Sequence, residues 1–330
     1  MKALLSEAPG APDTLVLRDI GEPVPGRGQV RIAVRYCGIN YPDVLVIEDK
    51  YQFKPPRPFA PGSEMSGVID AVGEGVTEFK VGDAVIAAAT SGGLAEKAVT
   101  AASACVSMPE GMPFDAAAGL IFTYGTSYHA LVNRSELRAG ETLLVLGAAG
   151  GVGLAAVEIG KAIGARVVAA VSGESKAAAA REHGADVTVI YPREGIDSRA
   201  LAAQFKEACG PKGADVIYDP VGGDYAEPAL RTAAWKGRYL VIGFPAGIPK
   251  IPLNLTLLKG CDIRGVFWGA FRQQEPAQDA ANMHALLDLY RAGKIKPKIS
   301  AILPLPQGGE AIKKLLQREA VGKILVSCTA

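Results

Sequence analysis

The chain has 330 residues, of which 49% are hydrophobic and 21% are charged, and its formal net charge is only +1. This length suggests two domains with sizeable cores, whereas the near-zero charge argues against neutralisation of a nucleic-acid backbone. No apolar run reaches membrane-spanning length without a glycine or charge, and the first residues show no signal-peptide pattern. We therefore expect a cytoplasmic protein whose partners are small molecules; a membrane partner is not expected, and the charge balance argues against nucleic acid.

The five cysteines are widely spaced and form no C-x-x-C pair. Such spacing fits neither a disulfide framework nor a zinc ribbon. We expect reduced, buried thiols at Cys37, Cys105, Cys209, Cys261 and Cys328.

Short β-like runs separated by glycine and proline signals occupy the chain up to about residue 105. This pattern predicts an antiparallel, barrel-like domain. The predicted strands are 29–35, 66–72, 83–88 and 95–99.

From about Pro113 the pattern alternates between helices and apolar strands. Alternation of this kind predicts an α/β domain with a doubly wound parallel sheet. We predict helices at 115–133, 151–164, 174–183, 198–209 and 224–234, and strands at 142–147, 166–171, 187–190, 214–218 and 237–243. A helix at 283–290 and a strand at 323–327 follow, in a tail expected to rejoin the first domain.

The most informative stretch is 143–158, where an apolar run breaks into a glycine cluster and resumes at helical spacing. It predicts a strand, a tight turn and a helix. Gly147, Gly150, Gly151 and Gly153 leave room for a diphosphate near the helix N-terminus, whose N–H groups and dipole favour an anion. A dinucleotide is the predicted ligand, although glycines also serve tight turns and close helix packing.

The residue that closes the next strand decides between cofactors. A carboxylate there would bind the ribose of NAD, but this chain has Ser172 and Gly173, with Lys176 one turn later. The missing acid and the added cation favour NADPH; the alternative is that Lys176 is an ordinary solvated helix residue.

Six motifs together resemble the medium-chain dehydrogenase/reductase superfamily, and within it the zinc-free, zeta-crystallin-like quinone oxidoreductases. They are Cys37–Asp43 (CGINYPD), Pro61–Gly67 (PGSEMSG), Gly82–Val85 (GDAV), Ala148–Gly153 (AAGGVG), Tyr218–Gly223 (YDPVGG) and Val321–Lys323 (VGK). The resemblance implies a GroES-like β-barrel catalytic domain at 1–122, a Rossmann domain at 123–264, and a segment at 265–330 that rejoins the catalytic domain. It also implies a homodimer and a substrate bound between the domains.

Zinc-dependent members of that superfamily have a cysteine where this chain has Asn40 and a histidine where it has Ser63. Neither an amide nor a hydroxyl competes with those groups for Zn²⁺, so we expect no metal. Without a Lewis acid the substrate must already be electrophilic, which favours hydride transfer to a quinone or an α,β-unsaturated carbonyl.

The resemblance implies two catalytic residues. Asn40 is expected beside the nicotinamide, and Tyr51 falls where related enoyl-thioester reductases carry a proposed proton donor. Alternatively, Asn40 serves a turn and Tyr51 packs in its loop. Asp43 is expected to order this loop through backbone hydrogen bonds.

The resemblance also implies a set of cofactor contacts. Tyr191 would cover the adenine and Lys323 would add charge near the 2′-phosphate, unless they are a strand-end aromatic and a solvated lysine. Together with Ser172, Gly173 and Lys176, the set comprises Asn40, Thr126, Gly150, Gly151, Val152, Gly153, Tyr191, Gly243, Phe244, Phe267 and Lys323.

Two other functions stay open from the sequence. The same hydride step could reduce the C=C bond of an enone or an enoyl thioester, with Lys50, Lys54 and Arg57 available to a charged acyl carrier. From another class, zeta-crystallin relatives include lens structural proteins and RNA binders, so the alternative for this chain is a nucleotide-gated RNA-binding or structural protein. The near-zero net charge argues against tight RNA binding.

Overall fold

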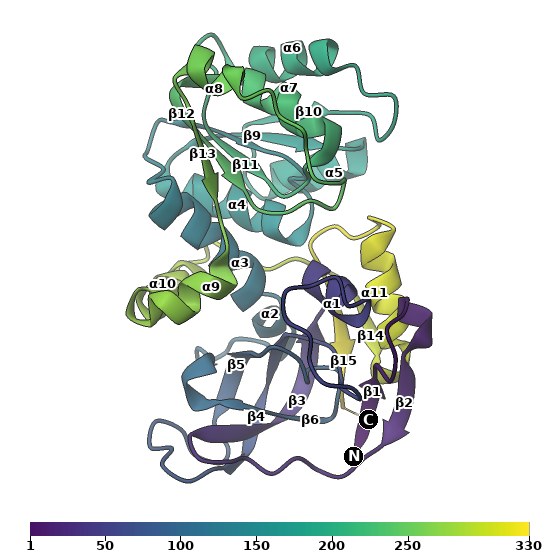
Figure 1. The fold of residues 1–330 in the computed structure, drawn as a ribbon. Coiled ribbons are helices and arrows are strands. Elements are labelled where there is room, and N and C mark those ends of the chain that lie inside the picture. Colours follow the sequence, from purple (N-terminus) through teal and green to yellow (C-terminus); the bar gives the residue numbers. More distant parts are fainter. Residues whose placement is uncertain (330) are drawn as a thin grey trace. The chain divides into compact units, whose positions relative to one another are not determined.

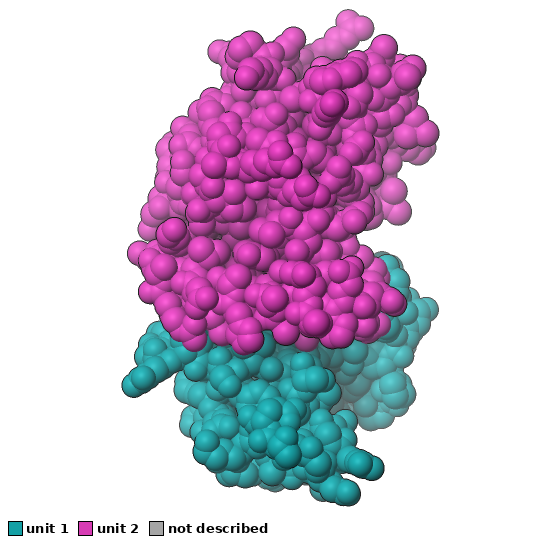
Figure 2. Space-filling view, turned by 90° about the vertical axis from the view of Figure 1, so that its left-hand side faces the viewer, with its two compact units in different colours: residues 1–122, 297–330 teal, residues 123–296 magenta. Residues whose placement is uncertain are grey.

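The computed structural model describes residues 1–329, which form two compact units. Unit 1 comprises residues 1–122 and the C-terminal residues from Pro297 on, and unit 2 comprises residues 123–296 (Figure 2). The expected assignment of all of 265–330 to the first domain therefore differs from the structure, because residues 265–296 pack within unit 2. The Trp268 indole lies against Gly125, where a Cβ would be 2.7 Å from the ring, and the Asn282 amide donates to Asn133 at 2.7 Å.

Unit 2 is built on a six-stranded parallel sheet with the strand order β10-β9-β8-β11-β12-β13. Its central strands are almost continuously buried, as expected of a parallel sheet covered on both faces. The strands are β8 (Thr142–Val145), β9 (Arg166–Val171), β10 (Val187–Ile190), β11 (Ala214–Asp219), β12 (Ala233–Val241) and β13 (Asp262–Gly265).

Helices alternate with these strands along the chain (Figure 1). The local sequence explains their ends: the Asp197 carboxylate accepts N–H groups from the first turn of α6, and Gly164 ends α4 with a φ of 95°. The helical segments are α3 (Ile121–Tyr128), η3 (His129–Arg134), α4 (Gly151–Ile163), α5 (Glu174–Glu182), α6 (Ser198–Cys209), η4 (Gly223–Tyr225), α7 (Ala226–Arg231), α8 (Asn254–Lys259), α9 (Trp268–Gln274) and α10 (Pro276–Arg291).

Unit 1 holds a seven-stranded sheet in which the C-terminal strands lie beside an N-terminal one (Figure 1). Strand β3 pairs with β4 along one edge, and with β15 and β6 along the other. The strands are β3 (Gln29–Gly38), β4 (Glu64–Val72), β5 (Ala84–Ala88), β6 (Lys97–Ala101), β7 (Cys105–Ser107), β14 (Ile299–Pro304) and β15 (Lys323–Ser327). A separate pair, β1 (Lys2–Leu5) and β2 (Val16–Asp19), and the helical segments η1 (Pro12–Thr14), α1 (Tyr41–Ile47), η2 (Ala102–Ala104), α2 (Phe114–Ala118), η5 (Leu305–Gln307) and α11 (Gly308–Leu316) complete it.

The predicted fold class, a parallel-sheet Rossmann domain plus a GroES-like domain, is confirmed. Two predicted helices were too long. The helix predicted at 115–133 is interrupted at Gly119, and the one predicted at 224–234 ends at Arg231. In the second case tertiary pairing overrides helix propensity, because Ala233 pairs with Ala214 at the start of β12.

Gly153 should be irreplaceable for packing, because a Cβ there would lie 2.3 Å from the carbonyl oxygen of Gly147. We expect Gly153→Ala to lower the free energy of unfolding by about 1–3 kcal/mol through overpacking. At Gly150 a Cβ would be 3.5 Å from the same oxygen, an ordinary contact, so Gly150→Ala should change stability by no more than about 0.5 kcal/mol. Urea unfolding without cofactor measures both; equal losses would contradict the packing argument.

Candidate functional site

A buried polar cluster in unit 1 forms where three elements begin. Asn40 immediately precedes α1, Glu64 is the first residue of β4 and Lys323 is the first residue of β15. Strands β4 and β15 both pair with the end of β3 at Gly38, which brings their first residues together. Gly38 must be glycine here, because a Cβ would lie 2.2 Å from the Ala118 carbonyl oxygen and 2.7 Å from Glu64 Oε2.

The Lys323 ammonium is enclosed by acceptors. Its Nζ donates to the Ile39 carbonyl oxygen at 3.0 Å, to Asn40 Oδ1 at 2.7 Å and to Glu64 Oε2 at 2.8 Å. The Lys323 and Glu64 side chains are 4% and 0% exposed. An ammonium has three N–H donors, so all three are used within unit 1. This corrects the expectation that Lys323 adds charge near a 2′-phosphate, because no donor is left for a phosphate oxygen.

The Asn40 amide is held in one orientation. Its Nδ2 donates to the Gly38 carbonyl oxygen at 3.2 Å and to Glu64 Oε2 at 3.0 Å, while its Oδ1 accepts from Lys323. The reverse orientation would point an NH₂ group at an ammonium and an oxygen at a carboxylate, both repulsive. The chemistry of the neighbours therefore assigns the two amide atoms.

Asp43 orders the start of α1, as expected. Its Oδ2 accepts the backbone N–H of Asn40 at 2.7 Å. Burial raises the pKa of Asp43 to about 6, although the N–H groups of Asn40 and Gly62 and the nearby Lys323 ammonium act to lower it. Asp43 therefore binds a proton far more readily than an exposed aspartate.

Tyr51 lies in the loop after α1, and its half-buried ring is 6.2 Å from that of Phe53. Burial, with a smaller contribution from the Asp43 charge, raises the pKa of Tyr51 above its ordinary value. The phenol is therefore protonated at neutral pH and able to donate its O–H.

The glycine-rich turn of unit 2 leads directly into α4. Gly150 precedes the helix in an extended conformation, and Gly147 has a φ of 56°. The first N–H groups of an α-helix have no acceptor within it, and its dipole favours an anion there. Ser127 Oγ, from α3, donates to the Val152 carbonyl oxygen at 2.9 Å and so braces the first turn of α4. The turn can therefore hold a diphosphate.

Strand β9 ends at Val171, and Ser172 and Gly173 connect it to α5. Lys176 lies in the first turn of that helix. The acid nearest to them in sequence, Glu174, accepts from Arg181 at 2.8 Å. The residues expected at the adenine ribose are thus a hydroxyl, a glycine and a lysine, with the neighbouring carboxylate paired to an arginine.

Most of the other predicted cofactor residues follow the parallel strands. Because these strands run the same way, their carboxyl ends meet at one edge of the sheet, where nucleotides bind in this fold class. Thr126 is buried within α3, and the ring of Tyr191 is 4.7 Å from that of Tyr225. Tyr191 follows β10, and Gly243 and Phe244 follow β12. Phe267 directly precedes α9.

Sequence reasoning missed the part played by Glu64. The residue belongs to the recognised PGSEMSG motif, but no role was attached to it. Its Oε1 accepts the N–H of Phe122 at 2.9 Å, and its Oε2 accepts from Asn40 and Lys323. A glutamate opening a run of buried strand residues was the available signal, since buried carboxylates need partners.

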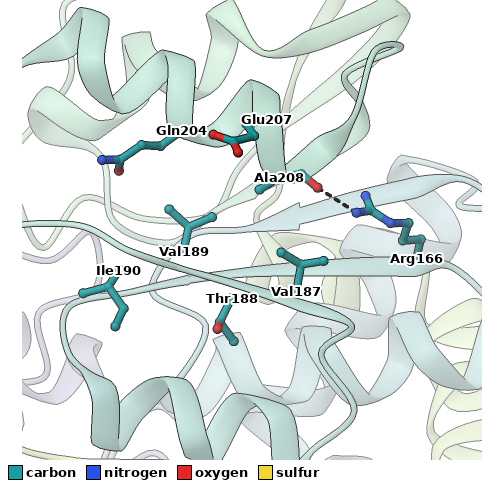
Figure 3. Close-up of a pocket in the computed structure, with 8 residues that line it drawn as sticks. All are labelled: Arg166, Val187, Thr188, Val189, Ile190, Gln204, Glu207 and Ala208. Atoms are coloured by element: carbon teal, nitrogen blue, oxygen red, sulfur yellow. Dashed lines mark hydrogen bonds between the residues drawn. The ribbon is translucent and has the colours of Figure 1, made fainter.

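A groove of about 460 Å³ lies in unit 2 between edge strand β10 and helix α6 (Figure 3). Arg166 donates to the Ala208 carbonyl oxygen there at 2.8 Å. Its lining residues are Arg166, Val187, Thr188, Val189, Ile190, Gln204, Glu207 and Ala208. None of them is a predicted site residue, although Ile190 directly precedes Tyr191.

Within residues 1–329, no group of three or more His, Cys, Asp or Glu side chains is arranged to hold a metal ion. The buried Ser63 hydroxyl has no hydrogen-bond partner in the described part of the chain. The five cysteines are free thiols and all are buried. Across the same residues, no helix is long and apolar enough to cross a membrane.

Comparison with known proteins gives consistent matches. Residues 26–110 match the alcohol dehydrogenase GroES-like domain family, and residues 151–285 match the zinc-binding dehydrogenase family. The quinone oxidoreductase-like protein 2 homolog of Nematostella vectensis is 39% identical over 92% of this chain and 82% of its own. The quinone oxidoreductase of Homo sapiens is 34% identical over 96% of this chain and 94% of its own.

Among solved structures, Escherichia coli quinone oxidoreductase complexed with NADPH superposes with a TM-score of 0.90. It is 26% identical, and the match covers 99% of this chain and 100% of that one. Both units therefore have counterparts in that structure.

The raised pKa of Asp43 predicts an unusual pH dependence of stability. Its pKa is about 6 when folded and close to 3.8 when unfolded, so the folded state holds the proton more tightly. The stabilising contribution, about 3 kcal/mol, is complete below about pH 4 and is lost as the pH rises through about 6. Urea unfolding from pH 4 to 7 should show this loss for the wild type and not for Asp43→Asn.

Asp83 provides a control of opposite sign. Hydrogen bonds from Lys80 lower the pKa of the Asp83 carboxyl, so Asp83→Asn should leave the loss between pH 4 and 6 in place. If Asp43→Asn retains the wild-type loss as well, another group is responsible.

Proposed function

Because the chain belongs to the quinone oxidoreductase-like group of the medium-chain dehydrogenase/reductase superfamily, we propose that it is an NADPH-dependent oxidoreductase that reduces a quinone or an α,β-unsaturated carbonyl. The carrying observation is the glycine-rich turn at the N-terminus of α4, at the carboxyl end of β8, where a diphosphate would meet free N–H groups. Bound there, NADPH supplies the hydride.

The cofactor contacts are proposed from their positions. Gly150, Gly151, Val152 and Gly153 would hold the diphosphate, and Ser172, Gly173 and Lys176 the 2′-phosphorylated ribose. Within unit 2, Thr126, Tyr191, Gly243, Phe244 and Phe267 would complete the site. Asn40 is proposed as a further cofactor contact, as the family resemblance implies.

We propose that the activity does not depend on zinc, because the side chains around Asn40 and Ser63 are unsuited to bind it. The cluster around Asn40 already contains an ammonium, 2.7 Å from Asn40 Oδ1 and 2.8 Å from Glu64 Oε2, which would repel a metal cation. An amide and a hydroxyl at positions 40 and 63 are also poor zinc ligands. The residues present do not fit a zinc ion, so no step through a metal is proposed.

Without a metal, the chain's own groups must stabilise the negative charge that develops on the substrate oxygen. The Tyr51 phenol, protonated at neutral pH, is proposed as the donor to that oxygen. Exclusion of water and fixed positioning would supply the remaining assistance.

The direct test is NADPH oxidation with quinones, enones and enoyl thioesters, using protein treated exhaustively with a chelator. We expect turnover of a quinone or an enone at a rate unchanged by chelation. If only enoyl thioesters are turned over, the protein is an enoyl-thioester reductase and not a quinone or enone reductase. A complete lack of NADPH oxidation, or activity that needs restored zinc, would overturn it.

The proposed NADPH preference predicts that Lys176→Ala weakens NADPH binding and leaves NADH binding nearly unchanged. Loss of one charge-assisted hydrogen bond corresponds to a Kd increase of roughly 10- to 100-fold. Titration calorimetry measures both nucleotides, with Lys206→Ala, an exposed lysine of α6, as the control. Equal effects on NADPH and NADH would show that Lys176 does not read the 2′-phosphate.

Tyr51→Phe keeps the ring and removes only the hydroxyl. We expect kcat to fall by about 10²-fold for an enone, whose reduction adds a proton, and by less for a quinone that takes its protons from water. The measurement compares kcat for both substrates at saturating NADPH. If kcat for the enone is unchanged, the Tyr51 hydroxyl takes no part in the reaction, and the residue only lines the substrate site.

A homodimer is proposed from the exposed edge of unit 2. Strand β13 ends the sheet, and exposed strand edges favour pairing with another chain. Beside it in the chain, Leu253, Leu257 and Leu258 are 74%, 80% and 68% exposed, and Trp235, 72% exposed, lies against Gly260. A second copy would cover this apolar surface symmetrically.

The five free thiols favour a reducing compartment, so we also propose a cytoplasmic location.

The dimer proposal predicts that Leu257→Glu shifts the protein towards monomer, raising the dimer dissociation constant at least about tenfold by placing charge in an apolar interface. Sedimentation equilibrium measures the constant. Val24→Glu is the control, because Val24 is 84% exposed but belongs to unit 1. A wild type that is monomeric at micromolar concentration would contradict the proposal.

A further inference from the structure

A buried carboxylate that the proposed chemistry does not use lies at the carboxyl edge of the parallel sheet of unit 2. Asp219 is the last residue of β11 and is 3% exposed. Its Oδ1 accepts the backbone N–H groups of Val221 at 2.8 Å and Gly222 at 2.9 Å. Its Oδ2 accepts the phenol O–H of Tyr239, from the neighbouring strand β12. Asp219 therefore fixes the turn that follows its own strand.

The turn after β11 lies directly against the glycine-rich turn after β8. Gly147 has a φ of 56°, and a Cβ there would lie 2.8 Å from Cγ2 of Val221. One methyl group of Val221 thus occupies the space into which a side chain at position 147 would project. A Cβ at Gly153 would lie 2.3 Å from the Gly147 carbonyl oxygen. The glycine-rich turn therefore contacts both Val221 and the first turn of α4.

The same segment is also joined to the turn after β12. The Val221 carbonyl oxygen accepts the N–H of Ala246 at 2.9 Å, and the N–H of Gly223 donates to the Gly247 carbonyl oxygen at 2.7 Å. Strands β8 and β12 both pair in parallel with β11, so the turns that follow these three strands are neighbours. Asp219 is the side chain that holds the middle one.

From these contacts we propose that Asp219 is a positioning residue for the dinucleotide, acting through Val221 on the glycine-rich turn. The inference rests on the proposed function and deepens it. A carboxylate repels a diphosphate, so Asp219 does not bind the cofactor itself. It holds Val221 against Gly147, and so keeps the N–H groups at the start of α4 where a diphosphate would meet them. Tyr239 supports this role, because its phenol fixes the direction of the Asp219 carboxylate.

An aspartate is well suited to this position. Hydrogen bonds to an ionised acceptor are stronger than those to a neutral one, and a carboxylate can accept all three donors at once. Burial raises the pKa of the Asp219 carboxyl, and the hydrogen bonds that it accepts act to lower it. The three donors therefore favour the ionised form that holds them.

The test compares NADPH with adenosine 2′-monophosphate, which has the adenine, the ribose and the 2′-phosphate but no diphosphate. Titration calorimetry measures the Kd of each ligand. In Val221→Ala, which removes the methyl group against Gly147, and in Asp219→Ala, we expect the Kd for NADPH to rise about five- to tenfold, the effect of about one hydrogen bond to the diphosphate. The Kd for adenosine 2′-monophosphate should not change, because the residues proposed to bind it follow β9.

Two further variants separate the hydrogen bonds of Asp219 from a general effect on the fold. The amide oxygen of Asp219→Asn can accept the same two N–H groups, so this variant should bind NADPH more tightly than Asp219→Ala does. Asp215→Ala is the matched control, because Asp215 lies in the same strand and accepts the Thr142 N–H at 2.8 Å, at the amino end of β8. We expect it to leave the Kd for NADPH unchanged.

Thermal unfolding shows whether each variant is folded. If Asp219→Ala does not fold, Tyr239→Phe takes its place, because it removes only the phenol hydroxyl that binds Asp219. We then expect the Kd for NADPH to rise about twofold or more, again with no change for adenosine 2′-monophosphate.

The outcomes separate the inference from the proposed function. If a folded variant of Asp219 to alanine, or Val221→Ala, binds NADPH as tightly as the wild type, the positioning role is wrong. An equal loss of affinity for both ligands would also overturn it, because a general disturbance of unit 2 weakens both. A wild type that binds neither ligand would refute the proposed function itself.

Discussion

The buried contact between Lys323 and Glu64 is the constraint on which unit 1 depends. It joins residues 259 positions apart and ties the C-terminal strand β15 to the N-terminal strand β4 across the end of β3. Removing either partner would leave an uncompensated charge in a buried setting, which is strongly destabilising. The C-terminal segment is therefore an integral part of the first unit, and Asn40 takes its position from that junction.

The glycine-rich turn of unit 2 depends on close backbone packing. Gly153 allows α4 to approach the turn after β8, and Ser127 braces the first turn of that helix through the Val152 carbonyl oxygen. The close approach at Gly153 and the Ser127 hydroxyl together hold the turn and the first turn of α4 in one arrangement. That is the property a diphosphate site requires.

The two units supply different parts of the proposed reaction. Unit 2 contains the turn before α4 that is proposed as the anion site, while unit 1 contains an oriented amide at Asn40 and a protonated phenol at Tyr51. The Lys323 ammonium is the positive charge of the unit 1 cluster, and its N–H groups bind Asn40 Oδ1 and Glu64 Oε2. The substrate oxygen must then find its donor elsewhere, which gives Tyr51 its proposed role.

The sequence by itself determined the features that depend on local order. The apolar strand, the glycine spacing and the helix at 143–158 follow from neighbouring residues, as does Ser172 at the end of β9, and the strands at 166–171, 187–190 and 323–327 match the structure to the residue. Helix ends were less predictable: β12 begins at Ala233 because pairing with Ala214 outweighs helix propensity.

Only the tertiary structure decided the electrostatic partners. Lys323 looked like a free cation near a strand, and Glu64 had no assigned role, because their contact spans most of the chain and leaves no local pattern. The direction of the Asn40 amide depends on both of them, so it could not be deduced from Asn40 and its neighbours. Local spacing encodes backbone conformation, whereas the pairing of buried charges is settled by which distant strands lie side by side.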